Sequence, residues 1–144
     1  MLRITGNPAL SSFRLQRLVQ ELRGPIPDLH ELDARFEHFI DTHAALTRDE
    51  HQRLAALLDY GEPAPPPAET DEQCLVVPRL GTLSPWSSKA TDIAHNCGLL
   101  EVRRIERGVR WHISLQGANR LTPQQRRQLH ARLHDRMTET VLES

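Results

Sequence analysis

A proline-rich stretch near the middle of the chain limits most strongly what this sequence can fold into. Residues 62–72 hold Pro63, Pro65, Pro66 and Pro67 among acidic residues and alanines. Proline lacks a backbone donor and has a fixed φ, so this stretch can be neither helix nor central strand. We predict an exposed, extended linker there. It divides the chain into a first half, residues 1–61, and a second half, residues 73–144.

The first half begins with the pattern of a strand followed by a helix. Met1–Thr5 is short and mostly apolar and predicts a strand, and Gly6-Asn7-Pro8 predicts a turn. Apolar residues then recur at helical spacing from Leu15 to Leu22, and Gly24-Pro25 ends the helix that they predict.

A change of period predicts a strand next. Apolar residues at the even positions from Leu32 to Ile40 alternate with mostly charged residues, which is typical of a long, half-buried antiparallel strand. His38 lies on its apolar face and is expected to be a core or interface histidine. A capping box from Thr47 to Glu50 then opens a second helix, which closes near Tyr60-Gly61.

The second half repeats this order. Cys74–Val77 predicts a strand, and a helix with its buried face on Ala90, Ile93, Ala94 and Cys97 follows and stops at Gly98. Leu99–Glu106 and Val109–Leu115 predict two strands about Gly108, and Leu121-Thr122-Pro123 opens a last helix. We therefore predict an α/β protein, an α+β sandwich of two pseudo-twofold-related βαββα halves, with helices packed on one antiparallel sheet layer.

Composition excludes several classes of protein. Eighteen basic residues nearly balance nineteen acidic ones, which favours neither nucleic acid nor an anionic membrane. No apolar run approaches the ~20 residues of a membrane span. The two cysteines form neither a disulfide framework nor a zinc-ligand pattern, so we expect a protein of the reducing cytoplasm without a metal site.

The helix of the second half carries the most informative polar residues. At ~100° per residue, Ser88, Asp92, His95 and Asn96 share the arc opposite the apolar residues, with Lys89 at its edge. One interpretation is a solvated helix face with a serine cap, and the other is a surface presented to a ligand or another domain. Either Ser84 or Ser87 caps the helix, whose positive end would suit an anion.

Other candidate chemistry is weak. His130 and His134 are one turn apart but have no third ligand, and Cys97 is expected to pack rather than react. The serines are not in a nucleophile elbow, and no glycine-rich phosphate loop is present. We therefore assign no catalytic residue to this chain.

Residues Ser84–Gly98 closely resemble the N-terminal region of large, single-chain phosphoribosylformylglycinamidine synthases. The resemblance extends over nearly the whole chain, except for the proline-rich linker. Its supporting segments are 6–11, Pro78-Arg79 with Gly81-Thr82, 104–108 and 133–139.

The resemblance implies an enzyme that converts formylglycinamide ribonucleotide to its amidine with ATP, Mg²⁺ and glutamine. The synthetase and glutaminase domains lie beyond this segment in family members, so neither ATP nor Mg²⁺ is expected to bind here. The N-terminal domain of the family is similar to a dimer of the small PurS-type subunit. Its implied role is to dock the synthetase and glutaminase domains of the same chain together and to help cover the substrate, formylglycinamide ribonucleotide.

We expect a set of polar and aromatic side chains to face the rest of the enzyme or its substrate. They are Arg79, Trp86, Ser87, Ser88, Lys89, Asp92, His95 and Asn96. An alternative from another functional class is a free-standing α/β regulatory or small-subunit module, in which the polar arc binds a small anionic ligand or partner domains.

Overall fold

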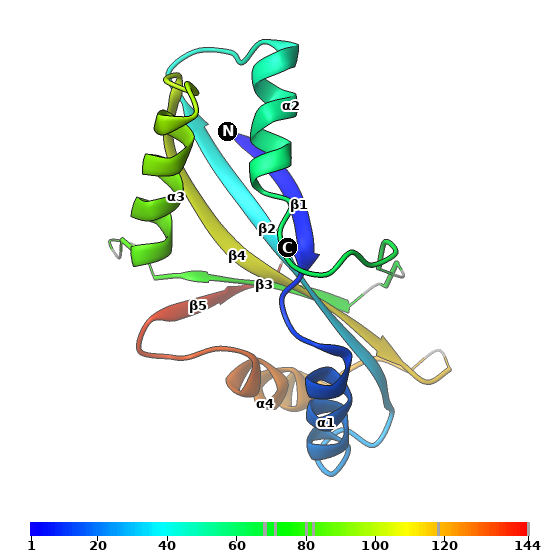
Figure 1. Ribbon diagram of the computed structural model, residues 1–144. Helices are drawn as coiled ribbons and strands as arrows, with labels where there is room; N and C mark the ends of the chain where they lie inside the picture. The colour runs from blue at the N-terminus through cyan, green and yellow to red at the C-terminus, as the bar shows by residue number, and fades with distance from the viewer. Residues whose placement is uncertain (68, 71, 80, 82, 118, 144) are drawn as a thin grey trace.

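A computed structural model describes residues 1–144 except 68, 71, 80, 82, 118 and 144. Its described residues form one antiparallel sheet with strand order β1-β2-β4-β3-β5, together with four helices (Figure 1). This confirms the predicted α+β class. The elements in chain order are β1 (Leu2–Pro8), α1 (Ser12–Leu22), β2 (Leu29–Thr42), α2 (Arg48–Leu57), β3 (Glu72–Pro78), α3 (Pro85–Asn96), β4 (Val102–Leu115), α4 (Pro123–Leu133) and β5 (Glu139–Leu142).

The long strands β2 and β4 pair along their whole length at the centre of the sheet. Each has 14 residues, and the order of buried, half-buried and exposed residues is the same in both at every position but one. That position is Ala34 in β2, which is buried, and Arg107 in β4, which is half-buried. The two strands thus have matching environments, while the division of the chain at residues 62–72 remains a prediction.

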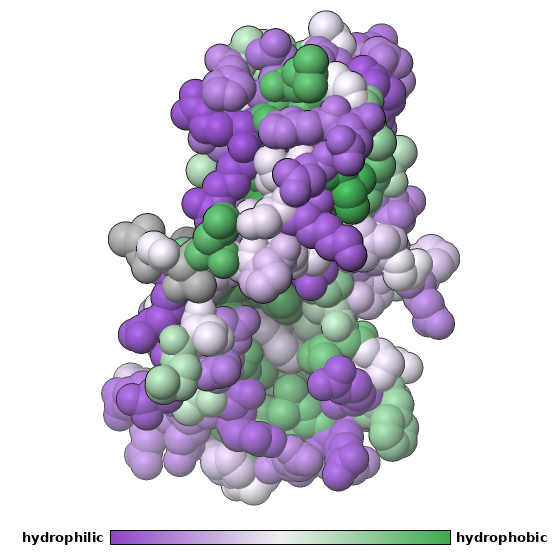
Figure 2. All heavy atoms as spheres, turned by 60° about the vertical axis from the view of Figure 1, so that its left-hand side comes forward, coloured by the Kyte–Doolittle hydropathy of each residue, from purple (hydrophilic) through white to green (hydrophobic). Residues whose placement is uncertain are grey.

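All four helices pack on one face of this sheet. Paired residues of neighbouring strands share a face, and the pairs Leu32–Ile113 and Ile40–Ile105 both point into the core. Figure 1 shows α1 and α4 at one end of the long strands and α2 and α3 at the other. Each pair of helices covers its own hydrophobic cluster. Figure 2 shows the molecule hollowed between these ends, with hydrophobic residues at the bottom of the hollow.

The opposite face of the sheet is polar. Arg110 and Glu37 form an ion pair across β4 and β2 with an N–O distance of 2.9 Å. Arg35 is bound to Asp33 and donates from Nη2 to the Pro65 carbonyl at 2.7 Å. Residues 62–66 are exposed and have no regular secondary structure, and this bond fixes them against the sheet. Glu72, the last residue of the predicted linker, instead begins β3. No described helix has the length and apolar character needed to cross a bilayer.

The sequence-based elements did not include β5. Two predicted boundaries also differ from the structure because of close approaches at glycines. Gly6–Pro8 belongs to β1 rather than to a turn, and a Cβ at Gly6 would lie 2.6 Å from Cε1 of His38. The two strands predicted about Gly108 are one strand, β4. A Cβ at Gly108 would lie 2.6 Å from the Val76 carbonyl oxygen, so this glycine lets β3 approach β4 rather than ending a strand.

Candidate functional site

Side chains of the domain itself cap the N-terminus of α3. Ser84 is the N-cap, because its Oγ accepts from the Ser87 N–H at 3.1 Å, and Pro85 is the first helical residue. The Ser84 hydroxyl also contacts the Glu106 carboxylate at 3.1 Å. A carboxylate therefore already lies beside the positive end of the helix. The alternative cap, Ser87, is thereby excluded.

The inner face of α3 is polar and covers the outer edge of β4. Ser87 donates from its hydroxyl to the Ile105 carbonyl, and Thr91 Oγ1 accepts from the Ile105 N–H at 3.1 Å. His95 is exposed, but its Nε2 donates to the Val102 carbonyl at 2.6 Å. These side chains bond backbone groups of β4 at the edge where β3 no longer pairs with it. Of the predicted contact residues, Ser87 is therefore turned inward, with 1% of its surface exposed.

The predicted apolar inner face of α3 was only half right. Ala94 is buried and Ala90 is half-buried against the same cluster. Ile93, however, is 44% exposed, and Cys97 is exposed. The helix is rotated from the expected orientation because its inner side contacts the polar backbone of a strand edge, where hydroxyls and an imidazole serve better than methyl groups.

The outer side of α3 carries four of the predicted contact residues. Ser88, Lys89, Asp92 and Asn96 are all exposed. Within the described residues their side chains form no hydrogen bond or ion pair, so nothing in the fold requires these residue types. Arg79 is also exposed, beyond the end of β3, and its backbone N–H donates to the Thr138 carbonyl at 2.9 Å.

Trp86 connects α3 to an aromatic cluster, which consists of Phe36, His38, Tyr60 and Trp86 around Arg107. The Trp86 ring centre lies 5.7 Å from that of His38 and 6.5 Å from that of Tyr60. The Arg107 guanidinium carbon lies 4.5 Å from the Trp86 ring centre. Strand pairing places His38 opposite Arg107, on the helix-covered face.

A chain of hydrogen bonds orders this cluster. His38 is 0% exposed, and its Nδ1 donates to the Ile4 carbonyl at 3.2 Å. Burial, with a smaller contribution from the Arg107 charge, lowers the pKa of His38 below 6.5. In the neutral ring, Nε2 accepts from the Tyr60 hydroxyl at 2.7 Å, and Tyr60 Oη in turn accepts from Arg107 Nη1 at 3.1 Å. Each donor and acceptor thus has one consistent role.

Sequence reasoning missed most of this cluster. It singled out Trp86 and expected His38 to be a core or interface histidine, and burial confirms the core reading of His38. Phe36, Tyr60 and Arg107 were not assigned a role, since they lie far apart in the chain and meet only through strand pairing and packing. The available signal was the scarcity of aromatic residues: Phe36, Tyr60 and Trp86 are half of the six.

Two cavities on the helix-covered face adjoin the cluster. Tyr60 and Trp86 line a cleft of about 310 Å³ between α2 and α3, together with Lys89 and the partly exposed Leu57 and Ile93. Phe36 lines a second cavity of about 470 Å³, whose walls include α1 and the end of α4. The described residues contain no group of three or more His, Cys, Asp or Glu placed to hold a metal ion.

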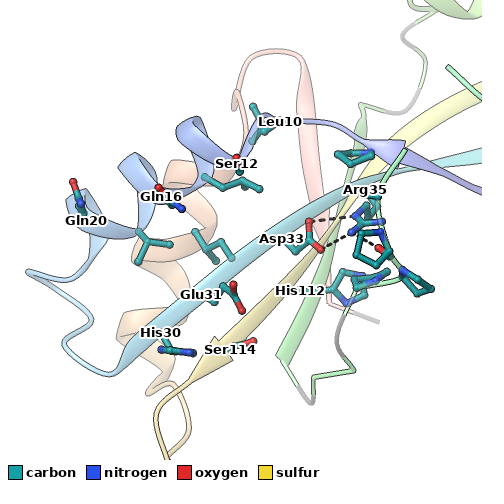
Figure 3. Close-up of a pocket in the computed structure, with 18 of the residues that line it drawn as sticks. Leu10, Ser12, Gln16, Gln20, His30, Glu31, Asp33, Arg35, His112 and Ser114 are labelled. Carbon is teal, nitrogen blue, oxygen red and sulfur yellow. Dashed lines mark hydrogen bonds and ion pairs between the residues drawn. The ribbon is translucent and has the colours of Figure 1, made fainter. Parts of the chain in front are cut away.

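A larger cavity, about 710 Å³, is at another place, between α1, the outer edge of β2 and the proline-rich segment. Figure 3 shows Asp33, Arg35 and His112 on one side of it and Gln16 and Gln20 of α1 on the other. Arg35 is already bound to Asp33 and Pro65. None of the predicted contact residues lines this cavity.

Comparison with known protein families adds one finding. The family model described as "Formylglycinamide ribonucleotide amidotransferase N-terminal" matches residues 35–144. This range runs from within β2 through β5, and it includes all of α3 and the whole aromatic cluster.

Proposed function

Because the chain belongs to the N-terminal family of formylglycinamide ribonucleotide amidotransferase, an enzyme of purine biosynthesis, we propose that it is a docking domain. It would hold the synthetase and glutaminase domains of that enzyme together and help to cover the substrate. In this proposal the chain supplies binding surface and the other domains supply the reacting groups.

The exposed side of α3 carries this proposal. Ser88, Lys89, Asp92 and Asn96 have no side-chain partner among the described residues. Lys89 lines the cleft together with the exposed apolar side chains Leu57 and Ile93, and Ser88, Asp92 and Asn96 are exposed on the same helix. An apolar centre with a polar border is the usual composition of a protein–protein interface. These four polar side chains have no partner within the described part of the domain and belong to the same helix as the apolar Ile93. This arrangement supports contact with another domain better than it supports a helix face that only meets solvent.

The family relationship supports a finer proposal about the reaction. We infer that the complete enzyme converts formylglycinamide ribonucleotide to its amidine with glutamine as the nitrogen donor. ATP and Mg²⁺ would activate the amide oxygen at a site outside this chain. The ammonia released from glutamine would then have to reach that site without escaping to solvent. A docking domain would help by holding the two domains together.

The test uses the full-length enzyme with Lys89→Ala and Ser88→Ala. Both side chains are exposed and unbonded, so the domain should keep its stability. We expect each variant to lower the glutamine-dependent rate by about tenfold, the effect of losing ~1.4 kcal/mol of contact energy. The measurement is steady-state kinetics with glutamine, alongside thermal unfolding.

Arg127→Ala is the matched control. Arg127 is an exposed cation on α4, away from α3, and its removal should leave the rate unchanged. Wild-type kinetics for both α3 variants would refute the docking role of this surface. Equal losses in all three variants would point to a general effect of surface charge and would count against it too.

A further inference from the structure

Arg107 occupies the one position at which the environments of β2 and β4 differ. The corresponding residue in β2 is the buried Ala34, whereas Arg107 is half-buried on the helix-covered face. Its guanidinium carbon lies 4.4 Å from the Phe36 ring centre and 4.5 Å from that of Trp86. Two cation–π contacts therefore hold the guanidinium in a fixed position among apolar groups.

This arginine has no acidic partner within the described part of the chain, unlike its neighbours on the sheet. Arg35 pairs with Asp33, Arg104 pairs with Glu106, and both ion pairs have an N–O distance of 3.0 Å. With the described residues, the Arg107 side chain makes one hydrogen bond, to the Tyr60 hydroxyl. A guanidinium carries a rigid fork of several N–H donors. Most of that fork therefore has no partner in the described part of the chain, and none of its nitrogens is among the fully buried unpaired atoms there, so solvent or a ligand can reach them.

The surroundings leave the fork available to a ligand. Arg107 is half-buried, so part of its side chain reaches the surface. Arg107 itself lines neither cavity described above, but rings in contact with it do: Phe36 lines the 470 Å³ cavity, and Trp86 and Tyr60 line the 310 Å³ cleft. The Tyr60 oxygen that accepts from Arg107 is itself fixed by neutral His38. The rings and this bond thus preorganise the side chain, which reduces the entropy lost when a ligand binds.

We infer that Arg107 is the centre of a binding site for an oxyanion, a carboxylate or a phosphate, supplied from outside this domain. A guanidinium recognises either group through two parallel charge-assisted hydrogen bonds. The aromatic cluster would exclude water from the pair and strengthen it. The inference goes beyond the docking role of α3 and does not depend on it, because it concerns an inner side chain rather than the exposed helix surface.

The test is an NMR titration of the 144-residue chain that follows the Nε–H resonance of Arg107. Sodium phosphate and sodium acetate are the probes, and sodium chloride at matched ionic strength is the control for screening. We expect a saturable shift with an oxyanion and none with chloride. Trp86 fluorescence should change along the same binding curve, since its ring contacts the guanidinium.

The two probes distinguish the sources of the oxyanion. Saturation at roughly tenfold lower phosphate than acetate would identify a phosphate-bearing ligand. Similar concentrations would identify a carboxylate-type site that an acidic side chain of a neighbouring domain can fill. The absence of a saturable shift with either probe would overturn the inference, and this result needs no substitution and hence no correctly folded variant.

Variants give the specificity control. Arg107→Met should abolish the binding curve, and Arg107→Lys should weaken it by about tenfold, since an ammonium keeps the charge but lacks the planar fork. Arg3→Met is the matched control, because Arg3 is an exposed arginine over the Phe39 ring, at 5.3 Å, on the polar face of the sheet. A loss of binding in Arg3→Met equal to that in Arg107→Met would show a nonspecific charge effect and overturn the inference.

Discussion

His38 is buried as the neutral ring, and its protonation would break an ordered set of hydrogen bonds. A proton on Nε2 would face the Tyr60 oxygen that already accepts from Arg107. Burial also lowers the pKa values of His112 and His130 below 6.5. All three histidines therefore bind fewer protons in the folded chain than in the unfolded chain at mildly acidic pH.

We predict that the free energy of unfolding falls as the pH drops below about 6.5. Stability is full above the ordinary pKa of 6.5, where both states are neutral, and it declines between 6.5 and the lowered folded value. Each histidine contributes up to ~1.4 kcal/mol per pH unit in that window. His38→Gln should remove one such contribution, as measured by urea unfolding at pH 7.5 and pH 5.5.

The control for this prediction is His51→Gln, which changes an exposed side chain on α2. It should keep the pH dependence of the wild-type chain. If His38→Gln also keeps the full wild-type slope, His38 does not titrate as argued, and the proposed tautomer chain through Tyr60 loses its support.

Gly108 is the second residue whose identity follows directly from a distance. Alanine there would place a Cβ 2.6 Å from the Val76 carbonyl oxygen and 2.9 Å from Val77 Cγ1. We predict that Gly108→Ala destabilises the chain by about 1–3 kcal/mol, because β3 must shift away from β4. Gly24→Ala, which meets nothing within 4 Å, should be neutral or stabilising by up to about 1 kcal/mol. Chemical unfolding of both variants tests this prediction. Equal stabilities would contradict the argument that a Cβ at position 108 clashes with β3.

Among the elements, α3 shows how a helix can replace a strand at a sheet edge. Its hydroxyls and imidazole bond the backbone of β4 in the place where β3 has ended. The element is therefore fixed by polar contacts as well as by the burial of Ala94. This arrangement fixes which side of α3 remains for contact with other domains.

We predict that Ser87→Ala lowers the free energy of unfolding by about 1–3 kcal/mol, because the buried Ile105 carbonyl loses its partner. The neighbouring Ser88→Ala should change stability by less than about 0.5 kcal/mol, since Ser88 is exposed and unbonded. The comparison is made by urea unfolding of the two variants. Matching stabilities would show that the Ser87 bond contributes nothing.

The sequence predicted elements better than contacts, and α3 shows why. Periodicity reports which side of a helix avoids water, and it located all four helices and the long strand β2 correctly in kind. It assigned Ile93 and Cys97 inward because it assumes an apolar neighbour, whereas α3 meets a strand edge. The Arg107 cluster could not be predicted, since it depends on the pairing of His38 with Arg107, which local patterns do not specify.

In the whole molecule, β2 and β4 have matching burial, but their outer edges are covered differently: side chains of α3 bond the edge of β4, and α1 lies beside the edge of β2. Counted from the N-caps Ser11 and Ser84, the positions of Ser87 and Thr91 in α3 are taken in α1 by Arg14 and Leu18. Neither α1 side chain bonds the edge of β2 in the described structure. The cavity shown in Figure 3 lies along that edge.

This asymmetry predicts different hydrogen exchange at Leu32 and Ile105, which occupy the same position in β2 and β4. The Ile105 N–H donates to Thr91 Oγ1 at 3.1 Å. The Leu32 N–H points to the same edge of β2 as the Ala34 carbonyl, which accepts from the Ala9 N–H. The pairing of β1 with β2 has already ended before Leu32, so β1 offers this N–H no acceptor. Leu32 should therefore exchange faster than Ile105, although both side chains are buried, at 3% and 1% exposure.

Amide exchange followed by NMR at one pH and temperature measures both sites in the same molecule. Thr91→Val removes the acceptor for Ile105 while keeping the shape of the side chain, and it should raise the Ile105 rate towards that of Leu32. The Leu32 rate should not change, since α3 lies at the other end of the long strands (Figure 1). Equal protection of the two amides in the wild-type chain would mean that the edge of β2 is covered after all. The cavity beside α1 would then be a closed feature of the fold rather than an open strand edge.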